Sequence, residues 1–155
     1  MSFLVPLHPE AILFKPNVTA KEPLIFEMVQ VLNEFSDAQK KDIYKAILDR
    51  EHIMSTGVGN GVAIPHSKIP SIDRQALSIA VLDQGIDFKS IDGKPVSLVF
   101  LVVGSQEQSK SHLRLLSQLS RSLMNLDWVN DLKTAHSKDI LLSLLASIVQ
   151  PDAIE

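Results

Sequence analysis

The sequence predicts an α/β fold: a single domain with a central mixed β-sheet flanked by helices on both faces. Predicted strands and helices alternate along the chain, which is typical of layered α/β architecture. Residues 96–103, with the sequence VSLVFLVV, are apolar at nearly every position, as in a strand that is covered on both faces. The length of 155 residues suits one domain with a substantial core, so we expect the domain to span residues 1–155.

The chain is expected to begin with a strand and a helix. Residues 11–14 form a short apolar run that predicts the first strand. Thr19 offers an N-cap, and Glu22 follows at the spacing of a capping box. These two residues predict a helix over about 20–35, with apolar residues along one face.

A second helix and a short strand should follow. Ser36 or Asp37 is expected to cap the helix, which should end near Glu51 or His52. Residues 62–65 then predict a strand, because they are apolar and follow a glycine-rich turn segment.

The second half of the chain predicts two longer strands and three helices. The strands are expected over 76–82 and 96–103, separated by a turn at Asp92-Gly93-Lys94. The helices are expected from a polar loop at 105–109 to about 125, over about 127–135, and over 137–149, where Pro151 ends the last helix.

Composition excludes several classes of function. The net charge of −3 gives no electrostatic footprint for nucleic acid. The chain has no cysteine, which excludes disulfides, thiol catalysis and thiolate metal sites and fits a reducing cytoplasm. The first ten residues lack the features of a signal peptide, and no apolar run is long enough to span a membrane. We therefore expect a cytoplasmic protein that does not insert into membranes.

The segment TGVGNGVAIPH, residues 56–66, is the most informative part of the chain. Three glycines at alternate positions permit a close approach of backbone or ligand, and Pro65 fixes its own φ and favours extended geometry before it. His66 is therefore held at the end of a rigid lead-in, at a strand end where ligands commonly bind in α/β sheets. A largely neutral imidazole can act as a nucleophile toward a phosphoryl group. The alternative is a loop histidine with an incidental polar partner.

Two interpretations apply to the glycine segment itself. The backbone of Thr56, Gly57, Gly59 and Gly61 could form an anion-binding nest, or it could form a tight turn without a ligand. The glycine spacing matches neither a phosphate-binding P-loop nor a dinucleotide fingerprint. Asn60, between two glycines, is expected to be a turn residue.

Arg50 and His112 are further candidates with structural alternatives. Arg50 lies near the end of the second helix, where a cation also interacts favourably with the helix dipole. His112 lies on one helical stripe with several leucines, and periodicity alone favours a contact at the edge of the core. A zinc site formed by His66, His112 and a carboxylate has no support from ligand spacing.

Residues 50–68, REHIMSTGVGNGVAIPHSK, resemble the signature of the fructose/mannitol-type enzyme IIA domains of the bacterial phosphoenolpyruvate-dependent phosphotransferase system. The segments IDFKSIDGKPV, VSLVFLVV and SHLRLL also occur in family order, so the resemblance covers about residues 7–149. Within the family, the chain looks most like the nitrogen-related IIA proteins, or IIA-Ntr. Ser67 departs from the glycine that most often follows the Pro-His pair.

The resemblance implies that phospho-HPr, or a nitrogen-branch homologue of HPr, phosphorylates His66 at Nε2. It further implies that His112 and Arg50 position or stabilise the phosphoryl group, with the backbone of residues 56–61 as support. No metal or organic cofactor is then needed, and an apolar, weakly charged docking patch should surround His66.

The resemblance leaves three functions open. Phosphorylation could be a nitrogen-related regulatory switch that controls binding to a transporter or kinase, which the free-standing chain favours. It could instead be a step in a relay that passes phosphate to a IIB domain for carbohydrate uptake. In the third, a degenerate IIA fold binds partners and is never phosphorylated.

Overall fold

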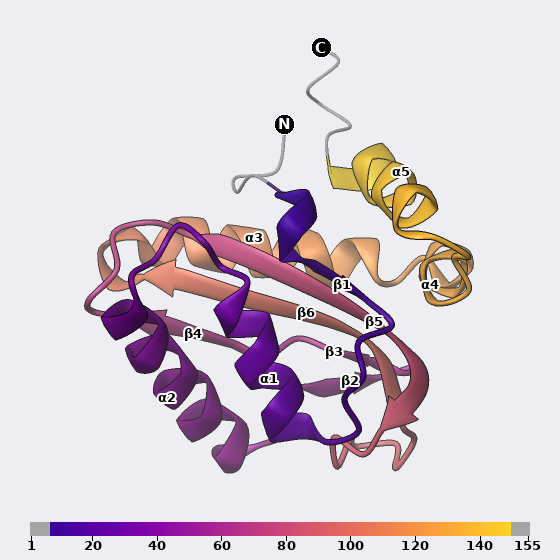
Figure 1. Ribbon diagram of the computed structural model, residues 1–155, viewed down its shortest axis with the longest axis horizontal. Coiled ribbons are helices and arrows are strands. Elements are labelled where there is room, and N and C mark those ends of the chain that lie inside the picture. Colours follow the sequence, from indigo (N-terminus) through magenta and orange to yellow (C-terminus); the bar gives the residue numbers. More distant parts are fainter. Residues whose placement is uncertain (1–6, 150–155) are drawn as a thin grey trace.

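Six strands form one mixed sheet in the computed structural model, which describes residues 7–149 (Figure 1). The strands are β1 (Ile12–Phe14), β2 (Gly57–Gly59), β3 (Val62–Ala63), β4 (His66–Ile69), β5 (Ala76–Ile86) and β6 (Val96–Ser105). The order is β1-β5-β6-β3-β2, and β4 also pairs with β6. β5 is antiparallel to β6, whereas β3 and β4 run parallel to β6 and β1 runs parallel to β5. The predicted mixed sheet is confirmed.

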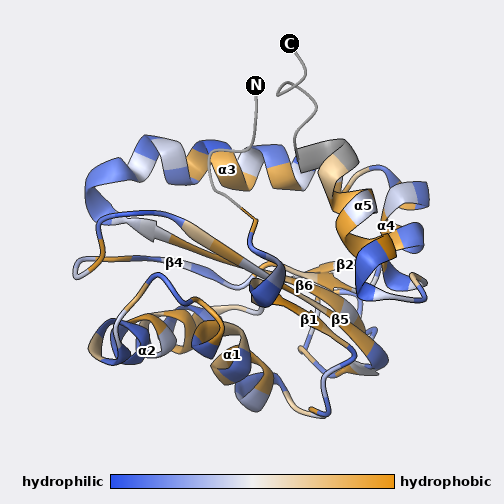
Figure 2. Ribbon diagram, turned by 45° about the horizontal axis from the view of Figure 1, so that its top comes forward, coloured by the Kyte–Doolittle hydropathy of each residue, from blue (hydrophilic) through white to orange (hydrophobic). Residues whose placement is uncertain are grey.

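Helices cover both faces of this sheet, as the sequence predicts (Figure 2). The helices are α1 (Lys21–Gln30), α2 (Asp37–Ile53), α3 (Ser109–Ser122), α4 (Leu126–Lys133) and α5 (Lys138–Val149), with short 3₁₀ turns η1 (Pro9–Ala11) and η2 (Gln106–Gln108). α1 and α2 lie on one face, and α3, α4 and α5 lie on the other. Pro151, expected to end the last helix, lies outside the described residues. Within those residues, no helix combines the length and apolar character that crossing a bilayer requires.

Strand β6 is buried on both faces because its residues are apolar at successive positions. Leu98, Phe100 and Val102 pack in the core beneath α3, α4 and α5. The intervening Val99, Leu101 and Val103 pack in the core beneath α1 and α2. Each of these six side chains is at most 1% exposed. The continuous apolar run therefore supplies two separate cores, one on each face.

The first helix is shorter than predicted, and Thr19 does not cap it. Ala20 is the N-cap residue and makes no side-chain cap bond. A helix capped by Thr19 would need the N–H of residue 23 to bond to the Thr19 carbonyl, and Pro23 has none, so the first such bond runs from Leu24 N to Ala20 O. The helix ends at Gln30, whose carbonyl accepts a hydrogen bond from Lys40 Nζ at 2.8 Å.

The second helix begins as predicted at Ser36. The Ser36 hydroxyl accepts a bond from the Gln39 N–H, and the Gln39 side chain accepts one from the Ser36 N–H. This reciprocal capping box satisfies two backbone donors and fixes the start of α2. The helix then extends to Ile53, which brings Arg50 and Glu51 into its last turn.

We predict that Ser36→Ala lowers the free energy of unfolding by about 1 kcal/mol, because the Gln39 N–H in the first turn of α2 loses its partner. Thr19→Ala is the matched control, since Thr19 makes no cap, and it should change stability by less than about 0.5 kcal/mol. Urea unfolding followed by circular dichroism measures both. Equal losses for the two variants would contradict the cap assignment.

Candidate active site

His66 is the first residue of β4 and follows the end of β3 by three residues, so the strand predicted over 62–65 is shorter than expected and a second strand begins at the histidine. β3 and β4 lie one after the other along β6, with Val62 opposite Leu98 and His66 opposite Val102. Pro65 interrupts the ladder because it has no N–H. The Pro65 carbonyl still accepts a hydrogen bond from Val102 N at 2.9 Å, which keeps β3 and β4 in register along β6. His66 is therefore fixed by sheet pairing, on an element more rigid than a loop.

The imidazole of His66 is oriented by a backbone carbonyl. Its Nδ1 lies 2.7 Å from Ile64 O. A carbonyl oxygen only accepts hydrogen bonds, so this contact requires that Nδ1 carries the proton. In the neutral ring, the lone pair is then on Nε2. The side chain is half-buried, which limits its motion and leaves it partly accessible.

His112 lies beside His66, as the sequence comparison suggested. The ring centroids are 6.2 Å apart and the ring planes are inclined at 45°. His112 comes from α3 and is only 5% exposed. A Cβ atom on Gly104 would lie 2.4 Å from His112 Nδ1, so only glycine at that position of β6 lets the ring pack there. Sequence reasoning missed Gly104, which a glycine inside a strand could have indicated.

Burial, together with the nearby charges of His66 and Lys68, lowers the pKa of His112 to about 4. His112 is thus neutral at physiological pH. Its Nδ1 has no hydrogen-bond partner among the described residues. The pair consequently consists of an oriented, half-buried histidine and a buried neutral one.

The glycine segment forms a β-hairpin. β2 and β3 pair antiparallel, and positive φ angles at Gly59, Asn60 and Gly61 form the turn between them. The backbone N–H groups of Thr56, Gly57 and Asn60 donate to side chains of Glu51, Ser55 and Asp92, respectively. These donors are therefore used within the protein. The contacts match the tight-turn interpretation, with Asn60 as the turn residue. These three N–H groups are not available to bind an anion, as an anion-binding nest would require.

Glu51 anchors this hairpin, a role that the sequence did not reveal. The carboxylate is 4% exposed. It accepts bonds from Thr56 N at 2.9 Å and Thr56 Oγ1 at 2.6 Å, and it pairs with Lys21 Nζ at 2.9 Å. Three segments meet at this one carboxylate: the start of α1, the end of α2 and the first residue of the hairpin.

Arg50 donates from Nη1 to the Met54 carbonyl at 2.8 Å, which satisfies the end of α2. That bond uses one of the five N–H donors of the guanidinium. α2 packs on β4, and Gln39 Nε2 donates to Ser71 O just beyond β4. Arg50 thus lies in the last turn of the helix that packs on β4.

Lys68 is a second cation near the histidines that sequence reasoning missed. Residues two apart on a strand point to the same side, so Lys68 lies on the same side of β4 as His66. Its Nζ donates to Ser109 Oγ at 3.2 Å, at the start of α3. Among the described residues, no three His, Asp or Glu side chains gather closely enough to hold a metal ion.

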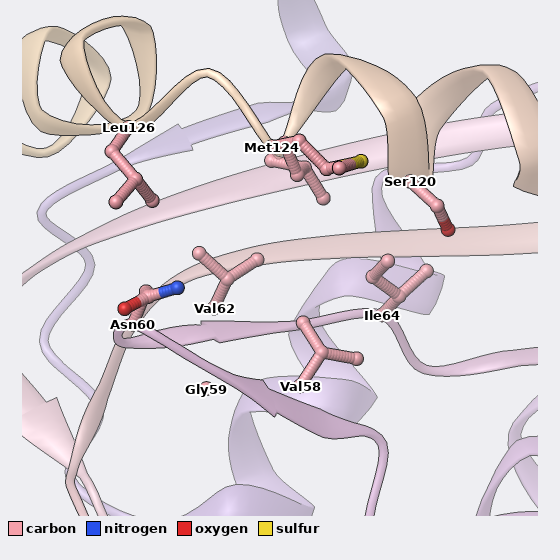
Figure 3. A pocket seen from close by; sticks show the side chains of 9 residues that line it. Val58, Gly59, Asn60, Val62, Ile64, Ser120, Met124 and Leu126 are labelled. Atoms are coloured by element: carbon pink, nitrogen blue, oxygen red, sulfur yellow. The ribbon is translucent and has the colours of Figure 1, made fainter.

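An apolar groove of about 370 Å³ lies between the hairpin and the end of α3 (Figure 3). Its lining includes Val58 and Ile64 from the hairpin side and Met124 from the chain after α3. Met124 is 78% exposed, and Val58 is also exposed. Because the Ile64 carbonyl holds His66, the groove and the histidine share a residue.

Residues 6–148 match the family model described as the phosphoenolpyruvate-dependent sugar phosphotransferase system, EIIA 2. The chain belongs to this enzyme IIA family. The resemblance found in the sequence is therefore confirmed, and it extends over nearly the whole chain.

Similar proteins include both regulatory and sugar-specific members. A nitrogen regulatory protein of Bradyrhizobium diazoefficiens is 35% identical over 138 residues, which cover 89% of this chain and 90% of that protein. The fructose-specific EIIABC component of Bacillus subtilis is 38% identical over 126 residues, which cover 81% of this chain but 20% of that longer protein. The crystal structure of IIA-Ntr from Neisseria meningitidis has a TM-score of 0.80 at 27% identity, covering 92% of this chain and 96% of that one.

We predict that Glu51→Ala destabilises the protein by about 3 kcal/mol or more, because Lys21 and the Thr56 N–H lose a buried partner. Glu51→Gln should cost less, since its amide oxygen still accepts from Thr56. Asp49→Ala removes an exposed carboxylate from the same helix and should cost less than about 0.5 kcal/mol. Urea unfolding of the three variants measures these differences. A loss for Glu51→Ala no larger than that for Asp49→Ala would refute the anchor.

Stability should also depend on pH through His112. An unfolded histidine binds a proton below about pH 6.5, whereas folded His112 stays neutral down to about pH 4. The contribution of His112 to the free energy of unfolding is therefore complete above pH 6.5. It decreases as pH falls toward 4, by about 3 kcal/mol at most. Unfolding midpoints measured across this window should fall less steeply for His112→Gln than for the unmodified chain. Identical slopes would contradict the lowered pKa.

Proposed function

We propose that the chain accepts a phosphoryl group on His66 Nε2 from phospho-HPr or a nitrogen-branch HPr homologue, and that this modification acts as a regulatory switch. In the transfer, the Nε2 lone pair attacks phosphorus and forms the new N–P bond. The donor's N–P bond breaks, and its electron pair returns to the donor nitrogen. The step exchanges one nitrogen for another and needs no proton transfer, metal or cofactor.

The observation that carries this proposal is the bond from His66 Nδ1–H to the Ile64 carbonyl. It leaves the lone pair on Nε2, and the same N–H can stay bonded after Nε2 is phosphorylated. Sheet pairing of β4 with β6 holds the ring before the donor arrives. Catalysis of such a transfer depends mainly on position and charge, and a ring that is already oriented meets the first requirement.

His112 and Arg50 are proposed to serve the phosphoryl group. A neutral His112 has one ring N–H, and its ring lies 6.2 Å from that of His66, close enough for a phosphoryl group between them to contact both. Arg50 lies in the last turn of α2, which packs on β4, and its guanidinium has four further N–H donors for phosphoryl oxygens. Residues 56–61 are proposed to act through the shape of the hairpin, since the N–H groups of Thr56, Gly57 and Asn60 are engaged within the fold.

The apolar groove beside His66 supports docking of a donor protein. A donor must bring its own histidine within a few ångströms of Nε2, so a surface for a protein has to adjoin the acceptor. The groove lined by Val58, Ile64 and Met124 shares Ile64 with the acceptor site, and no charged residue is among its lining residues. This agrees with the docking patch that the sequence analysis expects.

A regulatory switch is proposed first because a nitrogen regulatory protein matches the chain over 90% of its own length. The relay to a IIB domain is the second candidate. A fructose-specific relative is 38% identical, and the phosphorylated IIB of mannitol enzyme II forms a complex with its IIA, a structure that resembles this fold.

We predict that incubation with enzyme I, HPr and phosphoenolpyruvate adds the mass of one phosphoryl group, which acid removes. His66→Ala should abolish the gain, because the nucleophilic nitrogen is gone. His136→Ala removes an exposed histidine after α4 and should leave the gain intact. Intact-mass spectrometry measures all three proteins. A nitrogen-branch HPr homologue is tested in parallel as donor.

The outcomes separate the three functions. If the phosphorylated chain retains its phosphoryl group in the presence of a fructose-type IIB domain, the switch is supported, and rapid transfer to IIB supports the relay. Absence of labelling, in an assay that labels a known IIA domain, would refute phosphorylation and favour a binding module.

A further inference from the structure

We propose that Lys68 is a second positioning cation of the phosphorylation site, which holds the phosphoryl group on His66 against α3. This inference rests on the proposed phosphorylation of His66. The inference goes beyond that phosphorylation because the family resemblance assigns charge neutralisation to Arg50 of α2. The contacts of Lys68 point to a second cation on the other face of the sheet, beside α3.

The geometry rests on two parallel links between β4 and α3. His66 and Lys68 are two residues apart on β4, so their side chains lie on the same side of the strand, about 7 Å apart. Ser109 and His112 are three residues apart on α3 and lie on one face of that helix. His66 contacts His112, and Lys68 contacts Ser109, so the four side chains mark the corners of one small surface.

Burial fixes the face on which this surface lies. Ile69, which alternates with Lys68, packs in the core beneath α1 and α2. His66 and Lys68 must therefore point to the opposite face, where α3 lies. Lys68 itself is exposed, yet its Nζ is directed by Ser109 Oγ at 3.2 Å toward the first turn of α3.

Electrostatics agree with this arrangement. The positive charge of Lys68 contributes to the lowered pKa of His112, so its field reaches the histidine pair. A phosphoryl group on His66 Nε2 would lie in the same field and would be attracted to it. The surface then offers one cation and one neutral ring N–H, which together suit a doubly charged phosphoryl group.

The experiment compares Lys68→Met, Lys68→Arg and Lys110→Met with the unmodified chain. Lys110→Met is the matched control, since this substitution also removes one positive charge, at an exposed position in the first turn of α3. His66 is phosphorylated chemically with potassium phosphoramidate, whose P–N bond breaks and releases ammonia as Nε2 binds phosphorus. Phosphorus NMR then follows the pKa of the bound phosphoryl group, and proton–nitrogen NMR follows the pKa of His112 in the unphosphorylated protein.

Lys68→Met should raise both pKa values by about half a unit to one unit, because a nearby ammonium favours the phosphoryl dianion and disfavours the imidazolium. Lys68→Arg should keep the values of the unmodified chain, and Lys110→Met should also leave them unchanged. A structural role alone would not move the phosphoryl pKa while leaving the fold intact.

Two results would overturn the proposal: an unchanged phosphoryl pKa in Lys68→Met, or an equal change in Lys110→Met. Failure of the proposed function gives a different result. In that case phosphoramidate labels His66 and Lys68→Met shifts the phosphoryl pKa, but no phosphorylated HPr donor labels the chain.

Discussion

The backbone ladder of β6 is the constraint on which the rest of the structure depends. It pairs with β5 on one side and with β3 and β4, one after the other, on the other side. Buried polar backbone groups need such partners, and a strand covered on both faces has no water to replace them. The same ladder fixes the hairpin through Val62, fixes His66 opposite Val102, and provides Gly104 as the surface on which His112 packs.

Charge is arranged differently on the two faces of the sheet. On the face of α1 and α2, the buried carboxylate of Glu51 pairs with Lys21 and accepts two hydrogen bonds from Thr56. These contacts within the fold occupy the carboxylate. On the face of α3, no hydrogen bond or ion pair joins His66 or His112 to a carboxylate of residues 7–149, and Lys68 lies near this pair. A site with this balance favours an incoming anion. It also avoids the cost of burying an ionised histidine before the anion arrives.

In the proposed function, the apolar groove is the surface on which a partner protein docks. Ile64 lines the groove with its side chain and orients His66 with its carbonyl, so a protein bound in the groove contacts the residue that holds the acceptor ring. Phosphorylation would in turn add about two negative charges beside an apolar surface. Binding and modification are thus expected to influence each other, which suits both a switch and a relay.

The sequence by itself determined the α/β class, the two-sided burial of residues 96–103, the family, and the pairing of His66 with His112. Periodicity is local and carries the fold class and the two-sided burial directly, whereas the family and the histidine pair followed from the resemblance of the motif residues. The tertiary structure decided the rest. β3 ends before Pro65, but pairing with β6 resumes at His66, and Thr19 makes no cap because Pro23 has no N–H for the Thr19 carbonyl. Glu51, Gly104 and Lys68 gained their roles only when segments far apart in the chain met, since burial, close packing and electric fields depend on distance in space.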